Sequence, residues 1–139
     1  MRDTQNTEAR RPITRTFEGV KWTKHTCPDH NVPRWVASIP GTPLAVVRRV
    51  PCALLDEIDC FIAVPRRCSD GVLRFLHFDG STVAGSYPLT MAEKQAIWKI
   101  SERMPFWTVP INMRIRYPRF YDVRQASRVV ADLRRAVTE

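Results

Sequence analysis

Glycine and lysine are scarce in this chain: five of its 139 residues are Gly, and only four of its 22 basic residues are Lys. No glycine-rich phosphate loop is present, which argues against a nucleotide-binding fold of that type. No hydrophobic run is long enough to span a membrane, and the polar N-terminus lacks the apolar stretch of a signal peptide. We therefore expect a cytoplasmic protein whose four cysteines are reduced thiols.

Strong metal-ligating and catalytic motifs are also missing. His25, Cys27 and His30 resemble half of a zinc site, but no other pair of ligands follows at a suitable spacing. The acidic cluster at 56–59 could hold Mg²⁺, although a solvated turn is the simpler interpretation. No metal, cofactor or catalytic residue is predicted. A small metal-dependent enzyme, using Asp56, Asp59 or the Cys27/His30 loop, is the last of three hypotheses.

Arginine is what the chain has in abundance, with 18 of the 22 basic residues and a net charge of +8. The charge lies at both ends: residues 1–53 carry +5, residues 54–113 carry −1, and residues 114–139 carry +4. The planar guanidinium group binds phosphate through two donors and stacks on aromatic rings. The first hypothesis is therefore a non-enzymatic protein that binds nucleic acid, either RNA or DNA.

The length predicts a single domain. Residues 1–15 are polar and are expected to form a disordered basic arm, and residues 16–139 a single α+β domain. Strands are expected at 17–24, 35–39, 44–50, 60–64, 72–78, 81–87, 106–109 and 111–117, with a short helix or turn at 51–58. Because the two longer predicted helices come late in the chain, we expect an antiparallel sheet of about five to seven strands with two helices packed on one face.

Local signals define the helices and one hairpin. Thr90-Met-Ala-Glu93 fits a capping box, so a helix is predicted from 90 to 104, where Pro105 ends it. A second helix, capped by Asp122, is predicted over 122–137 from its apolar spacing. Asp79-Gly80 predicts a tight hairpin between 72–78 and 81–87. Apolar residues on both sides of 72–78 indicate a central strand, or one covered by helices.

The candidate nucleic-acid surface combines a basic strand, an aromatic turn and one side of the last helix. Its residues are Arg114, Arg116, Arg119, Phe120, Tyr121, Arg124, Arg128 and Arg135. The helical arginines would meet phosphates, and the aromatic rings would stack on bases or sugars. The alternative is a solvated helix face, in which Asp132 simply pairs with Arg128.

The second hypothesis is a protein-interaction factor. Trp98 falls on the polar side of the first helix, near Met91 and opposite the apolar face of Ala96, Ile97, Ile100 and Met104. Such a Trp either packs inside the monomer or binds a partner, for example a second copy of the chain. In the second case the protein could be an accessory or inhibitory factor of a mobile element that acts on a host protein or nucleoprotein complex.

Overall fold

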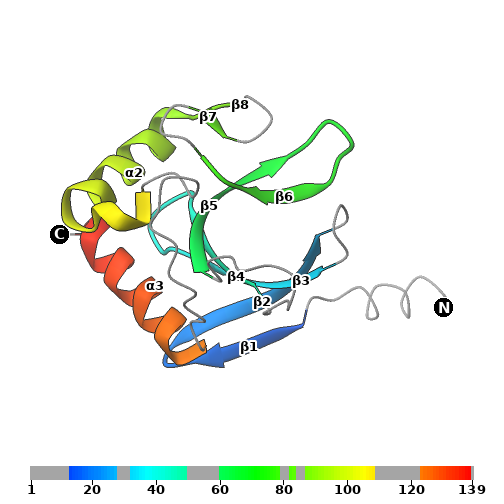
Figure 1. The fold of residues 1–139 in the computed structure, drawn as a ribbon, viewed down its shortest axis with the longest axis horizontal. Coiled ribbons are helices and arrows are strands. Elements are labelled where there is room, and N and C mark those ends of the chain that lie inside the picture. Colours follow the sequence, from blue (N-terminus) through cyan, green and yellow to red (C-terminus); the bar gives the residue numbers. More distant parts are fainter. Residues whose placement is uncertain are drawn as a thin grey trace.

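The computed structural model describes residues 13–27, 32–49, 60–78, 82–83, 87–108 and 123–138. Six strands form one antiparallel meander in chain order (Figure 1): β1 (Thr14–Phe17), β2 (Val20–Cys27), β3 (Val32–Ser38), β4 (Ala45–Arg49), β5 (Cys60–Arg67) and β6 (Leu73–Leu76). Strands β7 (Thr82–Val83) and β8 (Tyr87–Pro88) form a separate pair. Helix α2 (Met91–Arg103), the 3-10 helix η1 (Pro105–Thr108) and helix α3 (Val123–Thr138) follow. The predicted α+β class is confirmed.

Both helices pack on one face of the six-stranded sheet. Alternate strand residues, such as Trp22, Val46 and Ile62, join a single buried cluster with Ile100 of α2 and Leu133 of α3. Every second residue of a strand faces the same side of the sheet, which explains why alternate residues reach this cluster. Ile100 and Leu133 lie on the apolar sides of their helices. Figure 1 shows α2 and α3 together on the same side of the molecule.

The opposite face is lined by a second buried cluster and is strongly curved. Its members are Val36, Ala45, Val47, Phe61 and Ala63, with Phe75 packed against them. The ring of His25 on β2 meets that of Phe75 on β6, with 4.9 Å between the centroids. Because β3, β4 and β5 separate these two strands in the sheet, the contact requires the sheet to curl toward this face.

Helix α2 is fixed to the sheet by a buried carboxylate. Glu93, only 2% exposed, completes the predicted capping box: its side chain accepts from the Thr90 N–H at 2.8 Å, and its own N–H donates to the Thr90 hydroxyl. The Arg66 guanidinium on β5 donates to both Glu93 oxygens and to the Pro88 carbonyl. Burial alone raises the pKa of Glu93, but the hydrogen bonds from Arg66 and Thr90 lower it overall. The pair therefore stays ionised at neutral pH.

Helix α3 is fixed by a buried hydrogen bond. Trp22 is fully buried, and its indole N–H donates to the Ser127 hydroxyl at 2.9 Å. That hydroxyl in turn donates to the Val123 carbonyl at 2.7 Å, one helical turn earlier. The two residues that join the sheet to the helix are 105 positions apart in the chain.

Several local predictions are wrong. Segment 17–24 contains a turn at Glu18-Gly19, where both residues have positive φ, so it belongs to two strands instead of one. Strand β6 is an edge strand, so of the two alternatives given for its apolar sides the central strand is wrong. Among their described residues, segments 72–78 and 81–87 share an isolated bridge, Phe78↔Val83, whereas β6 pairs with β5 and β7 with β8. Residues 105–108 form a 3-10 helix in place of a strand.

Other predicted features fall wholly or partly outside the described residues. These are most of the basic arm, the helix or turn at 51–58, the Asp79-Gly80 turn, the strand at 111–117 and the Asp122 cap. Strand β1 takes in Thr14 and Arg15, the last two described residues of the predicted arm. Thr14 and Arg15 therefore belong to the sheet, and residue 13 adjoins it.

Replacing Ser127 tests the anchor of α3. In Ser127→Ala the buried Trp22 N–H loses its acceptor, so we expect the free energy of unfolding to fall by about 1–2 kcal/mol. Urea unfolding followed by tryptophan fluorescence measures the change. Ser101→Ala, at a half-buried serine of α2, is the matched control. If both variants unfold at the same urea concentration as the unmodified protein, the hydrogen bond does not anchor the helix.

Candidate functional site

Three of the arginines predicted to bind nucleic acid lie exposed along α3. Arg124, Arg128 and Arg135 share one side of the helix, opposite the buried Ala126 and Leu133, and we call them the α3 stripe. The side chains of Arg128 and Arg135 are 69% and 65% exposed. The stripe extends along about 16 Å of helix axis, at 1.5 Å per residue.

The other members of the predicted surface lie outside the described residues. They are Arg114, Arg116, Arg119, Phe120 and Tyr121. The stripe is therefore the part of the predicted interface that can be described.

Two acidic side chains pair with the stripe. The Arg128 Nε lies 3.5 Å from a Glu18 carboxylate oxygen at the β1–β2 turn, and Arg135 forms an ion pair with Asp132. Asp132 therefore pairs with Arg135, and not with Arg128 as the sequence suggested. All four side chains are at least 42% exposed, and such pairs are weak because water screens them. A phosphate group could therefore compete for these arginines.

Long-range attraction adds to the exposure of the stripe. The chain has 22 basic and 14 acidic side chains and a net charge of +8. The stripe thus belongs to a chain whose overall charge attracts anions.

A cleft of about 660 Å³ lies beside the stripe. Strands β2 and β3 pair from Cys27↔Val32 as far as Thr23↔Val36, but β2 begins at Val20 and β3 continues to Ser38. The two strands therefore extend past their last pair, and the cleft opens there with α3 along one side. Its lining comes from these strand ends, from Phe75 of β6 and from Val130, Ala131 and Arg134 of α3.

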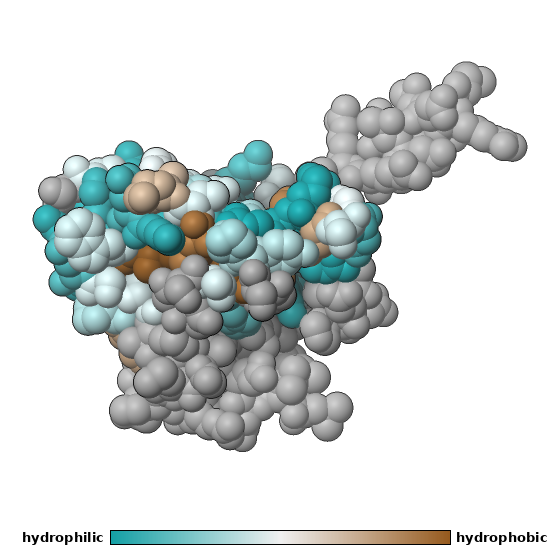
Figure 2. All heavy atoms as spheres, turned by 90° about the horizontal axis from the view of Figure 1, so that it is seen from above, coloured by the Kyte–Doolittle hydropathy of each residue, from teal (hydrophilic) through white to brown (hydrophobic). Residues whose placement is uncertain are grey.

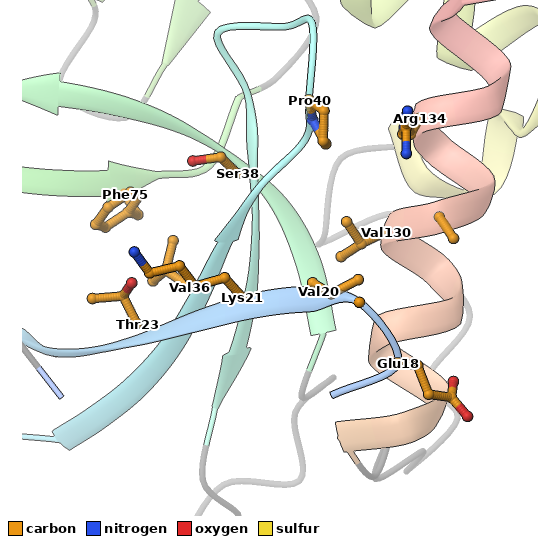
Figure 3. Close-up of a pocket in the computed structure, with 12 residues that line it drawn as sticks. Glu18, Val20, Lys21, Thr23, Val36, Ser38, Pro40, Phe75, Val130 and Arg134 are labelled. Carbon is orange, nitrogen blue, oxygen red and sulfur yellow. The ribbon is translucent and has the colours of Figure 1, made fainter. Parts of the chain in front are cut away.

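The charges around the cleft are mainly positive. Lys21 and Arg134 line it, and so does one acid, Glu18. In Figure 3 the Glu18 carboxylate points away from the other labelled side chains. No sequence pattern marked Lys21, Phe75 or Arg134 as a candidate binding residue. Arg134 is rotated by about 100° from Arg135 around α3, so it lies outside the stripe. Its position in the cleft depends on strands that are distant in the sequence.

The imidazole of His25 packs against the edge of the cleft through Phe75. Desolvation by burial, followed by the nearby positive charge of Arg34, lowers the pKa of His25 below 6.5. His25 is therefore neutral at pH 7. Its ring serves as a packing partner of Phe75 and adds no charge to the site at that pH.

The partner-binding residues predicted on α2 are exposed. Trp98 is 65% exposed and Met91 is 67% exposed, so Trp98 does not belong to the core. The two residues are seven positions apart and therefore lie on one side of the helix, between Lys94 and Lys99. From the side shown in Figure 2, hydrophilic side chains break the apolar surface of the described residues into small areas. Any interface on that side would include polar as well as apolar contacts.

The described ranges contain no group of three or more His, Cys, Asp or Glu side chains placed to hold a metal ion. His30, Asp56, Asp59 and the Cys27 side chain lie outside what the structure describes, so the predicted half-site and acidic cluster are not defined by it. None of the helices described is long and apolar enough to cross a membrane.

Acid titration tests the environment of His25. Because its pKa is lowered in the folded state, the unfolded chain takes up a proton first, near pH 6.5, and stability falls as the pH drops below about 7. In His25→Gln this part of the loss should disappear. Melting temperatures of both proteins between pH 7.5 and 5 measure it. An identical pH dependence in the two proteins would contradict the assignment.

Comparison of this chain with protein-family models, with curated proteins and with solved structures finds no match.

Proposed function

We propose that this protein is a small, non-enzymatic nucleic-acid-binding protein and that the α3 stripe contacts the phosphate backbone. The observation that carries the proposal is the exposure of three arginines on one side of a helix that is anchored to the sheet through Ser127. Anchoring reduces the entropy lost on binding because the helix is already in place. The net charge of +8 on the chain supports the same partner class.

A single-stranded partner fits the stripe better than a duplex. Single-strand binders combine a cationic surface with aromatic platforms, and the predicted surface joins the stripe to Phe120 and Tyr121 in sequence. At about 3.4 Å per nucleotide of a stacked strand, the stripe is long enough to follow roughly five phosphates. The interaction would be independent of sequence, because phosphate contacts position the strand without reading its bases.

Removing the stripe tests this function. In the triple variant Arg124→Ala, Arg128→Ala, Arg135→Ala we expect affinity for a labelled single strand to fall at least ten-fold. We also expect the slope of log affinity against log salt to decrease by about 2, since each phosphate contact on a single strand contributes roughly 0.7. Fluorescence anisotropy at several salt concentrations measures both quantities.

The matched control is the triple variant Lys94→Ala, Lys99→Ala, Arg103→Ala. It removes the same charge from exposed positions of α2 and leaves α3 intact. Equal losses in the two triple variants would show that net charge alone determines binding, and the stripe would then have no specific role. Circular dichroism should show that both variants keep their fold, because exposed ion pairs contribute little to stability.

The second candidate function is that of an accessory or inhibitory factor that binds a host protein or a nucleoprotein complex. The exposure of Trp98 and Met91 on one side of α2 favours it, since Trp is the residue most enriched at interface hot spots. The apolar pair is small and lies between lysines, so the partner surface would be apolar at its centre and acidic at its edge.

The variant Trp98→Ala separates an interface role from a structural one. We expect its free energy of unfolding to stay within about 0.5 kcal/mol of that of the unmodified protein, because the side chain is mostly in water. Any partner retained on the immobilised unmodified protein should be lost from the variant. Thermal unfolding and a parallel pull-down measure the two effects. A melting temperature lowered by many degrees would instead show that Trp98 supports the fold.

A further inference from the structure

The cleft beside the α3 stripe has the chemistry of a site for an amphiphilic anion. Its lining includes three valines and one phenylalanine: Val20, Val36, Val130 and Phe75. Its volume of about 660 Å³ is within the range of pockets that enclose small organic ligands. Val36 and Phe75 belong to one face of the sheet, so one face of a flat ring could lie against them at the opening.

The charges specify a negative ligand. Lys21 and Arg134 are the cationic groups of the lining, and they come from β2 and α3. The Glu18 carboxylate, the acidic group of the lining, points away from the other side chains labelled in Figure 3 and lies 3.5 Å from Arg128. The local balance therefore favours an anionic group at the cleft.

The cleft adjoins the stripe through α3 itself. Ala131 lines the cleft and lies on the helix surface between Arg128 and Arg135. A strand whose phosphates follow the stripe would thus pass the opening of the cleft. The hydroxyl groups of Thr23 and Ser38, which also belong to the lining, can both donate and accept hydrogen bonds with the polar edge of a base.

We propose that the cleft is a base-binding subsite for single-stranded nucleic acid. One base enters and lies against Phe75, while Lys21 and Arg134 contact the phosphates on either side of it. The inference rests on the proposed function and adds to it a requirement for an unpaired base. A base in an intact duplex is stacked and paired and cannot enter without being flipped out.

Comparison of a strand with bases and a strand without them tests this subsite. The probes are labelled 15-nucleotide oligo(dT), oligo(U) and an abasic deoxyribose-phosphate strand of equal length and charge. We expect at least one of the base-containing strands to bind about ten-fold more tightly than the abasic strand, which is the effect of one stacked base. Fluorescence anisotropy at one salt concentration measures all three affinities.

Two variants locate the preference in the cleft. Ala131→Leu should fill the opening from an exposed position of α3, and Phe75→Leu removes the aromatic ring from the floor. Both should lower the affinity for the base-containing strand about ten-fold, the effect of one stacked base, with abasic binding unchanged. Ala92→Leu, the same change at an exposed position of α2, is the matched control and should keep the preference. Because Phe75 also packs against the inner cluster, Ala131→Leu keeps the test valid if Phe75→Leu unfolds.

The outcomes separate the two proposals. Equal affinity of the unmodified protein for strands with and without bases would overturn the base subsite and leave backbone binding by the stripe intact. A preference of undiminished size in Ala131→Leu would place base recognition elsewhere and would also overturn the subsite. Absence of binding to all three strands at low salt would refute the proposed function itself, and the base subsite with it.

Discussion

The hydrogen bond from the Trp22 indole to Ser127 is the contact on which the positions of the α3 stripe and of the cleft depend. Trp22 fills the space between the sheet and α3, and a buried N–H of this kind is costly unless it finds an acceptor. Ser127 provides the acceptor at one position on α3, which fixes both the rotation and the axial position of the helix. The stripe consequently faces solvent, and Val130, Ala131 and Arg134 face the cleft. An apolar contact alone would allow the helix to rotate or slide, because apolar packing has little directionality.

The few acids of the described residues are largely used to hold arginines in place. Glu93 binds Arg66, and Asp70 binds Arg74 in a pair that lowers the pKa of Asp70 to about 2, mainly through hydrogen bonds from Arg74 and the Val72 N–H. Asp70 therefore remains ionised throughout the physiological pH range. Glu18 and Asp132 pair with the stripe instead. The chain has 22 basic and 14 acidic side chains, so intramolecular pairing cannot neutralise all of its positive charge. The remaining positive charge attracts anions from solution.

Features that depend on neighbouring residues could be predicted from the sequence, and features that depend on distant strands could not. The capping box at Thr90 and Glu93 and the periodicity of α3 are local, and both helices were predicted within two residues of their observed ends. The β1–β2 turn was missed because Glu18 adopts a positive φ without the Asn or Asp that usually marks such turns. Because both sides of β6 are apolar, it was expected to be a central strand or one covered by helices. In the structure Phe75 packs inside the curled sheet and Leu76 packs on the helix side, although β6 lies at an edge. The cleft has no sequence signal at all, since it forms where β2 and β3 extend past their last pair.

The stripe and the exposed side of α2 would contribute to binding in different ways. Charge on the stripe acts over about 8 Å at physiological ionic strength, so it mainly increases the rate at which an anionic partner is captured. Trp98 and Met91 act only on contact, when burial of their exposed surface lengthens the lifetime of a complex. Helices α2 and α3 share one buried cluster, so the two surfaces are held rigidly relative to each other. A nucleoprotein complex offers an anionic strand and an apolar protein surface together, and it could engage both. The two proposed functions are then compatible, because binding to the strand would raise the effective concentration of the protein surface near Trp98.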